Sequence, residues 1–346
     1  MQSDLDAFMA TMVAGARPMP IERALALARE RYGLEADATR LTGERDENFK
    51  LVTRDGGQFV LKAANPAESA VVAELQIAAL LHLERTDPSL PCPRVLRALD
   101  GDTQVRFRDG NGLERTARIV TYLPGRLLGE TARSCGQRAA CGRLGGRLAR
   151  ALGGFEHPAA HRLIIWDVCR VRHLAGLLGQ LPGFTLRPAA AALLARVAPA
   201  VEAQLPTLRR QVVHNDLNPR NILVDPADES RVSGVIDFGD LTHTALIADV
   251  AVAGADLIAP DCADAASARE SVLDVARAYQ ECVPLLQPEL AALGSLVAAR
   301  LLMNVVVHEW HVHHNPLSRH FAPLGPDYMR AQLQLADRLL SEGITP

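Results

Sequence analysis

Apolar and polar residues alternate with two different periods along this chain, and the change of period divides it into two parts. The first 20 residues carry a loose pattern that ends in Pro18 and Pro20. Between residues 39 and 122, short alternating apolar runs separated by turns predict β-strands. After residue 122 the apolar positions recur mostly every three or four residues, which predicts helices.

Two helices accompany the strands of the first part. One is predicted over Ile21–Tyr32 and ends at Gly33, and the other is predicted over Glu68–Glu84. The strands are predicted over residues 39–41, 49–53, 58–63, 94–99, 104–108 and 116–122. The turns Asp55-Gly56-Gly57 and Asp109-Gly110-Asn111-Gly112 predict hairpins between neighbouring strands.

The second part reads as a helical region built around one exceptional stretch. Helices are predicted over residues 136–152, 166–178, 188–208, 246–258, 267–282, 289–311 and 327–341. The exception is Val212–Asp240, the central stretch, where polar side chains follow apolar strand-like runs. Leu123-Pro124-Gly125 separates the two patterns, so we expect a β-rich N-lobe at residues 1–121 and a helical C-lobe at residues 122–346. The predicted fold class is α+β.

Length and composition are those of a folded, two-lobed chain. The 346 residues are 48% hydrophobic and 22% charged, which is enough apolar material for a sizeable core. The net charge of −3 gives no reason to expect nucleic acid as a partner. No pattern in the sequence specifies an oligomeric state.

Cysteine usage and apolar runs indicate the cytoplasm. The six cysteines form no C-x-x-C pair and are expected to be free thiols of a reducing compartment. Asp4 and Asp6 precede any apolar run, so a secretory signal is not expected. The longest apolar stretch, Leu290–Val307, contains Arg300 and Asn304 and is expected to be a buried helix and not a membrane span.

Lysine is rare in this chain. The basic residues comprise 35 Arg and only two Lys, Lys50 and Lys62. Such a ratio indicates a coding bias, and a lysine that survives it is expected where arginine cannot serve. A tight phosphate site can distinguish a compact ammonium from a planar guanidinium. Lys62, on the predicted strand 58–63, is therefore a candidate phosphate ligand, with an ordinary position on that strand as the alternative.

The central stretch holds polar side chains that suit phosphoryl transfer. In His214-x-Asp216-x4-Asn221, a carboxylate and an amide precede the apolar run Ile222–Val224, and a second apolar run ends in Asp237. A hairpin of these two runs would bring Asn221 and Asp237 together. Carboxylate and amide oxygens are ligands that Mg²⁺ prefers, and a carboxylate can accept the proton of a hydroxyl group.

Two motifs of the central stretch resemble those of the protein-kinase-like fold. His214-Asn215-Asp216-Leu217-Asn218-Pro219-Arg220-Asn221 resembles its catalytic loop, and Asp237-Phe238-Gly239 resembles its metal-binding triplet. Together with residues 41–49, 123–128 and 236–240, they make the chain most similar to the aminoglycoside phosphotransferase/choline kinase branch, and within it to hydroxylysine kinase and related stand-alone phosphotransferase domains. The resemblance covers residues 20–340 and implies a bilobal fold with a small β-sheet N-lobe and a larger helical C-lobe.

The resemblance also implies roles for individual residues. Asp216 matches the catalytic base, and Asn221 and Asp237 match the Mg²⁺ ligands. Lys62 matches the lysine that binds the donor phosphates, and Glu74 matches the carboxylate that holds this lysine.

Nucleotide contacts are implied in two further segments. The phosphate loop corresponds to Gly43–Asn48 and the hinge beside the base to Thr121–Leu123, so Gly43 and Leu123 are expected at the nucleotide, ATP or GTP. The chain lacks the G-x-G-x-x-G loop of protein kinases, and Asn218 stands where their catalytic loop has lysine.

Other polar residues admit more than one interpretation. His214 is expected to hold the loop backbone and not to react. Asp240 is a candidate substrate contact in a pocket for a cationic acceptor, and Asp249 either lines that pocket or braces the loop. The cluster His308–His314 does not match H-E-x-x-H, because Val312 lies four residues after His308. A solvated or substrate-lining cluster is expected there.

These features favour a small-molecule kinase whose acceptor, by the resemblance, is hydroxylysine or a similar hydroxylated amine or amino acid. Aminoglycosides, choline and homoserine are alternatives of the same class. A non-catalytic nucleotide-binding protein would be expected to lack Asp216, Asn221, Asp237 or Lys62, and all four are present. A metal-dependent hydrolase built on His308–His314 is a third alternative, which metal content would distinguish from a kinase.

Overall fold

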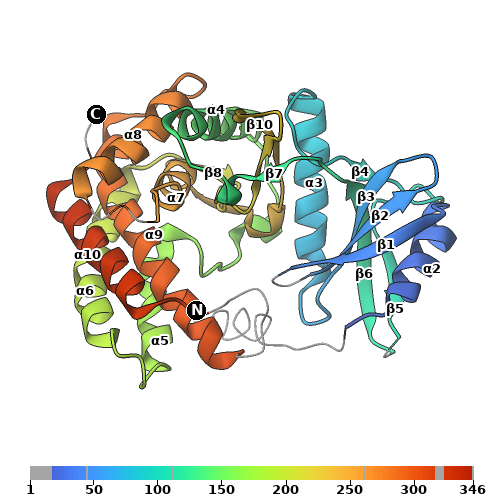
Figure 1. Ribbon diagram of the computed structural model, residues 1–346, viewed down its shortest axis with the longest axis horizontal. Coiled ribbons are helices and arrows are strands. Elements are labelled where there is room, and N and C mark those ends of the chain that lie inside the picture. The colour runs from blue at the N-terminus through green and yellow to red at the C-terminus, as the bar shows by residue number, and fades with distance from the viewer. Residues whose placement is uncertain are drawn as a thin grey trace. The chain divides into compact units, whose positions relative to one another are not determined.

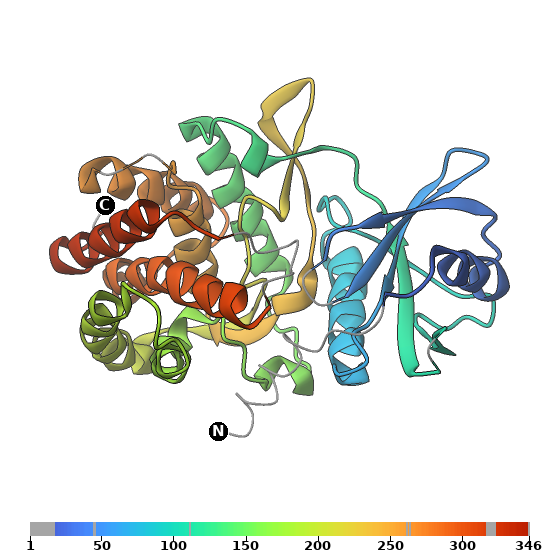
Figure 2. The same ribbon diagram turned by 60° about the horizontal axis from the view of Figure 1, so that its bottom comes forward.

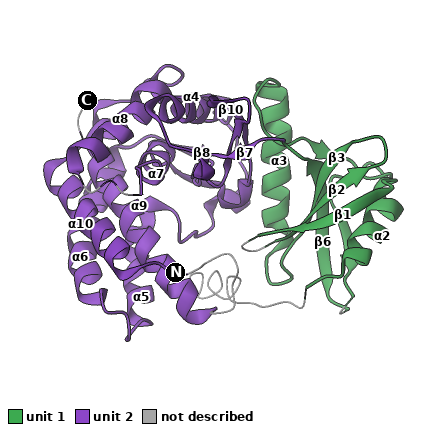
Figure 3. Cartoon of the chain, viewed as in Figure 1, with its two compact units in different colours: residues 1–123 green, residues 124–346 purple. Residues whose placement is uncertain are grey.

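The structure, a computed structural model, describes residues 18–43, 46–110, 112–260, 262, 264–315 and 323–344. The chain forms two compact units, Met1–Leu123 and Pro124–Pro346, which Figure 3 shows in different colours. The first contains an antiparallel sheet and the second is mostly helical, so the predicted α+β class is confirmed. The predicted lobe boundary after residue 121 falls at the end of the sheet, just before the junction of the units. Asp4 and Asp6 lie outside the described residues.

The sheet of the first unit is antiparallel throughout. Its strands are β1 (Ala36–Leu41), β2 (Glu47–Thr53), β3 (Gln58–Ala63), β4 (Val95–Leu96), β5 (Val105–Arg108) and β6 (Glu114–Thr121). They lie in the order β1-β2-β3-β6-β4, and β5 pairs with β6. The predicted hairpins are found as β2–β3 and β5–β6. β1 begins earlier than predicted, because Ala36 pairs with Thr53 at the far end of β2.

Two helices cover opposite sides of this sheet, α2 (Ile21–Tyr32) and α3 (Ala70–Thr86), as Figures 1 and 2 both show. Successive residues of a strand face opposite sides of the sheet, so each strand directs some side chains toward α2 and others toward α3. Phe49, Leu61 and Ile119 belong to the apolar core that includes α2. Lys62 and Arg118 are paired neighbours in the register of β3 and β6, and they face the other side.

The ends of α2 and of α4 (Cys135–Ala151) follow from their local sequences. α2 ends at Gly33, whose φ of 69° is easily adopted only by glycine, and the N–H groups of Gly33 and Leu34 donate to carbonyls of the last turn. α4 begins with a capping box. The backbone N–H of Gln137 donates to the side-chain oxygen of Ser134, and the backbone N–H of Ser134 donates to the side-chain oxygen of Gln137.

The second unit contains α9 (Gln287–His314), which packs against several other helices. Its other helices are α4, α5 (Leu174–Gly179), α6 (Arg187–Gln204), α7 (Ala248–Asp256), α8 (Ala265–Gln280) and α10 (Pro326–Glu342). Its strands are β7 (Arg126–Leu127), β8 (Arg210–Val213), β9 (Ile222–Asp225), β10 (Asp228–Val235) and β11 (Thr242–Ala245). α9 contacts α5, α6, α7 and α10. By length and composition it could cross a membrane, but 89% of its most apolar window is buried inside the protein, so the predicted buried helix is confirmed.

The predicted helix at residues 166–178 is wrong in its first half. Residues Val168–His173 form a 3₁₀ segment, and α5 follows it. The carboxylate of Asp167 accepts hydrogen bonds from the backbone N–H of Cys169 at 3.0 Å and from the hydroxyl of Thr244 at 2.9 Å. These contacts hold a tight turn before α5 that apolar periodicity does not encode.

α4 and α8 approach closely at two glycines of α4. A Cβ on Gly142 would lie 2.3 Å from the carbonyl oxygen of Val275, and a Cβ on Gly146 would lie 2.7 Å from that of Tyr279. Both neighbours are backbone atoms of α8, so they cannot rotate away. Only glycine fits at these positions without separating the helices.

The variant Gly142→Ala is therefore expected to lower the free energy of unfolding by about 1–3 kcal/mol, the usual cost of overpacking. Both tryptophans, Trp166 and Trp310, lie in the second unit, so tryptophan fluorescence during urea unfolding reports on this unit. The matched control on the same helix is Gly136→Ala, where the new Cβ would approach only the Ser134 hydroxyl, at 3.8 Å. Equal urea midpoints for the two variants would contradict this packing.

Candidate active site

Strand pairing brings the two ends of the central stretch together. β9 and β10 form an antiparallel pair in which Ile222 lies opposite Val235. One residue further out, the backbone N–H of Ile236 donates to the carbonyl of Asn221 at 2.8 Å. The predicted hairpin is therefore confirmed, and it places Asn221 beside the strand end that leads into Asp237.

A buried carboxylate on α7 holds the start of the loop between β8 and β9. Asp249 accepts hydrogen bonds from the backbone N–H groups of His214, at 3.2 Å, and Asn215, at 2.6 Å. Asn215 has a φ of 66°, a conformation that costs free energy for a residue with a side chain. Burial raises the pKa of Asp249, while His214 and these two N–H groups lower it. Of the two interpretations of Asp249, the contacts support the brace.

His214 contacts backbone atoms through both ring nitrogens. Nδ1 accepts the backbone N–H of Asp216 at 3.3 Å, which leaves Nε2–H to donate to the carbonyl of Ile236 at 3.3 Å. Its ring packs edge-on against Phe238 with centroids 4.8 Å apart. Burial lowers the pKa of His214, which keeps the ring neutral. The side chain connects the loop to the Asp237 segment.

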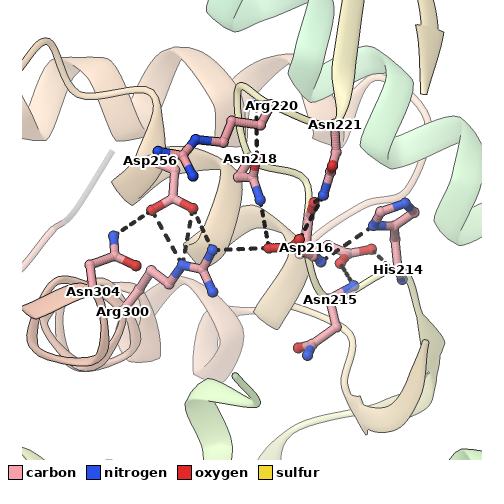
Figure 4. Close-up of polar contacts among 10 residues, drawn as sticks. His214, Asn215, Asp216, Asn218, Arg220, Asn221, Asp256, Arg300 and Asn304 are labelled. Carbon is pink, nitrogen blue, oxygen red and sulfur yellow. Dashed lines mark hydrogen bonds and ion pairs between the residues drawn. The ribbon is translucent and has the colours of Figure 1, made fainter. Parts of the chain in front are cut away.

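The carboxylate of Asp216 is held from both sides (Figure 4). Oδ2 accepts a hydrogen bond from Nδ2 of Asn221 at 2.6 Å. Oδ1 accepts one from Nδ2 of Asn218 at 2.8 Å and another from Nη2 of Arg300 at 3.0 Å. Burial raises the pKa of Asp216 to about 6, against the guanidinium of Arg300, which lowers it, and with the charge of Asp240 raising it further. A carboxylate with this pKa is mostly ionised at neutral pH and is well matched to a general base.

Arg300 is the functional candidate that sequence reasoning missed. It donates to Asp216, and it also donates from Nε and Nη2 to Asp256, the last residue of α7, at 2.6–3.2 Å. Asn304, one turn further along α9, donates to Asp256 at 2.7 Å. The guanidinium carbon lies 5.0 Å from the ring centroid of Trp166. The sequence did contain a signal for it: Arg300 is a charged residue in the middle of an apolar helix, and a buried charge requires partners of opposite charge.

Asp237 and Asn221 form a donor set that fits a divalent cation. Asp237 is exposed and has a left-handed φ of 60°, and its carboxylate accepts the N–H of Gly239 at 3.1 Å. Because Nδ2 of Asn221 is used by Asp216, its amide oxygen is the atom available to a cation. One carboxylate and one amide suit Mg²⁺, which usually retains water and binds substrate phosphates.

Asp240 lies close to these groups. It is buried at the end of a short 3₁₀ segment, Phe238–Asp240, and its charge raises the pKa of Asp216. The structure therefore brings Asp216, Asn221, Asp237 and Asp240 into one region of the second unit.

The residues of the first unit that are predicted to bind the nucleotide lie on or next to the sheet, on α3 and at the C-terminal end of the unit. Lys62 is half-buried on β3, and Leu123 is the last residue of the unit. A Cβ on Gly43 would lie 2.4 Å from the carbonyl oxygen of Asp46, so the loop itself requires glycine there. Glu74 is exposed on α3 and accepts a hydrogen bond from Gln104 at 3.3 Å. In the described part of the chain no ion pair joins Glu74 to Lys62, and the role of Glu74 stays a prediction.

The histidine cluster at the end of α9 packs on an aromatic side chain. His314 stacks on Trp310 with ring centroids 4.2 Å apart, and His311 meets the same ring edge-on at 5.4 Å. Trp310 donates its N–H to Gln180 at 2.8 Å. Among the described residues, no three His, Cys, Asp or Glu side chains are grouped so that they could hold a metal ion. The contacts give the hydrolase alternative no support.

The chain belongs to the phosphotransferase enzyme family (APH), whose family model matches residues 37–291. The protein is therefore a small-molecule phosphotransferase that acts on a hydroxyl group. Its sequence is similar to hydroxylysine kinase of Mus musculus, with 28% identity over 318 residues that cover 85% of this chain and 83% of the relative. It is also similar to hydroxylysine kinase of Danio rerio, with 30% identity over 233 residues that cover 64% and 65%.

Solved structures share the fold. The microcompartment-associated aminopropanol kinase has a TM-score of 0.71 at 21% identity, with coverage of 93% of this chain and 98% of that one. Amicoumacin kinase hAmiN, in complex with AMP-PNP, Ca²⁺ and Ami, has a TM-score of 0.69 at 15% identity, with coverage of 94% and 95%. The predicted protein-kinase-like fold is therefore confirmed.

Proposed function

We propose that this phosphotransferase transfers the γ-phosphoryl group of ATP or GTP to the hydroxyl of a small amine or amino acid, with hydroxylysine as the first choice. The observation that carries the proposal is the setting of Asp216, an ionisable carboxylate held between Asn221 and Arg300. The similarity to two hydroxylysine kinases supports the acceptor. AMP-PNP in the complex of amicoumacin kinase supports a nucleotide as donor.

In this mechanism Asp216 accepts the proton of the acceptor hydroxyl as its oxygen attacks the γ-phosphorus. The hydrogen bonds from Asn218 and Arg300 fix the plane of the carboxylate and favour its ionised form. His214 and Asp249 hold the loop that carries it, so the base is positioned before the acceptor binds.

Other residues would hold the donor. Bound Mg²⁺ neutralises charge on the donor phosphates. The amide oxygen of Asn221 and the carboxylate of Asp237 would bind it, and Lys62 would contact the non-transferred phosphates. Gly43, Glu74 and Leu123 are proposed only as supporting residues of the nucleotide site.

A non-catalytic nucleotide-binding role is not favoured. Such a protein has no need for a carboxylate with a pKa of about 6 held by three side-chain donors. A cytoplasmic location is part of the proposal, and the six cysteines, which are free in the structure, support a reducing compartment.

The test is release of nucleoside diphosphate in a coupled assay with Mg²⁺ and either ATP or GTP. The panel contains hydroxylysine, homoserine, choline, aminopropanol and an aminoglycoside, with an acceptor-free control. The highest kcat/KM is expected for hydroxylysine. A higher kcat/KM for choline or the aminoglycoside would contradict the acceptor, and no acceptor-dependent release with either nucleotide would contradict the kinase function.

A further inference from the structure

Arg300 is a charged side chain in the middle of the apolar helix α9. It is 3% exposed. A buried guanidinium is stable only where its N–H groups meet acceptors, because loss of hydration costs several kcal/mol. Nε and Nη2 are satisfied by Asp256, and Nη2 also by Asp216.

The remaining nitrogen of Arg300 is buried without an acceptor. Nη1 makes no hydrogen bond to any described residue. In Figure 4 it is the lower nitrogen of the guanidinium, away from Asp256, and carries no dashed line. A buried donor left unsatisfied costs about 1–3 kcal/mol, so its position indicates a partner outside the chain.

The position of Nη1 places that partner beside the reacting group. Nη1 shares its carbon with Nη2, which lies 3.0 Å from Oδ1 of Asp216. The guanidinium is held in place by Asp256 and lies over the ring of Trp166, at 5.0 Å from the centroid. It is a preorganised, planar cation next to the base with one N–H-bearing nitrogen still available, and a guanidinium binds carboxylates and phosphates by charge-assisted hydrogen bonds.

We infer that Nη1 of Arg300 binds the carboxylate of the acceptor, so that the enzyme selects an amino acid over an amino alcohol, choline or an aminoglycoside. This inference rests on the proposed function and narrows it. In hydroxylysine, four carbon–carbon bonds separate the carboxyl carbon from the carbon that bears the hydroxyl, an extended span of about 5 Å. Such a span lets the carboxylate reach Nη1 while the hydroxyl reaches Asp216, because Nη1 shares its carbon with the nitrogen that contacts Asp216.

A purely positioning role is the competing explanation. In that case Arg300 would only orient Asp216, and its loss would slow every acceptor equally. If Arg300 binds the carboxylate, its loss instead lowers the ratio of kcat/KM for an amino acid to kcat/KM for the same molecule without its carboxylate. The ratio therefore separates the two explanations.

The first experiment compares two such pairs with wild-type enzyme: hydroxylysine with 1,5-diaminopentan-2-ol, and homoserine with 3-aminopropan-1-ol. For the pair that is phosphorylated, kcat/KM is expected to be about 10–100-fold higher for the amino acid, the range of one charge-assisted hydrogen bond. Equal values, or turnover of the carboxylate-free compounds alone, overturn the inference but leave a kinase. No turnover of any acceptor overturns the proposed function, and the inference with it.

The second experiment uses Arg300→Gln, for which the ratio is expected to fall to about one. The matched control is Asn304→Ala, which removes a hydrogen bond to Asp256 from the same helix face and should keep the wild-type ratio. Arg300→Lys retains a charge opposite Asp256 if the Gln variant does not fold, and it too should lose most of the ratio. A wild-type ratio in a folded Arg300 variant contradicts carboxylate binding.

Discussion

Replacing Asp216 by Ala or by Asn is expected to lower kcat by roughly 10²–10⁴-fold, the usual size of a general-base contribution. The reason is that both substitutions remove the carboxylate that accepts the hydroxyl proton, while the backbone of the loop stays tied to Asp249 and His214. The measurement is the steady-state rate of nucleoside diphosphate release at saturating donor and acceptor.

Asn218→Ala is the matched control for Asp216. It removes a 2.8 Å hydrogen bond to the same carboxylate and leaves the base in place. A smaller loss of kcat, about tenfold, is expected from one such hydrogen bond. Unchanged activity in either Asp216 variant would remove this residue from the mechanism.

Asp249→Ala is expected to lower the free energy of unfolding of the second unit by about 2–5 kcal/mol. The substitution leaves the buried N–H groups of His214 and Asn215 without their acceptor, and the left-handed conformation of Asn215 without its support. The shift is measured as the urea midpoint of tryptophan fluorescence.

The conservative control is Asp249→Asn, which keeps the shape and one acceptor oxygen. An intermediate loss of stability is expected, because one of the two N–H groups can still be satisfied. If the Ala variant is as stable as wild type, Asp249 does not hold the loop.

Local pattern was sufficient to predict much of the fold and the polar residues of the central stretch. The hairpins β2–β3 and β9–β10 follow from turn residues and apolar runs that are close in sequence. Asp216, Asn221 and Asp237 were recognisable because each lies within three residues of the end of a strand. Strand pairing then accounts for Asn221 lying beside the strand end that leads into Asp237.

The distant partner of the base, Arg300, could not be predicted from the sequence. Arg300 is 84 positions from Asp216, and their contact depends on how α9 packs against α7 and the loop. The same holds for Glu74 and Gln76 on α3: periodicity identifies the helix, but packing exposes Glu74 and buries Gln76 against Arg118. A charged residue in an apolar run shows that a partner exists, and only tertiary structure shows which one.

The central claim is that this chain phosphorylates the hydroxyl of a small amine or amino acid with Asp216 as the base. The most direct test is mass spectrometry of hydroxylysine after incubation with ATP or GTP, Mg²⁺ and either wild-type protein or Asp216→Asn. The account predicts that hydroxylysine gains one phosphoryl group with the wild-type protein and remains almost unmodified with the variant in the same time. Unmodified hydroxylysine with wild type, or equal phosphorylation by both proteins, would contradict it.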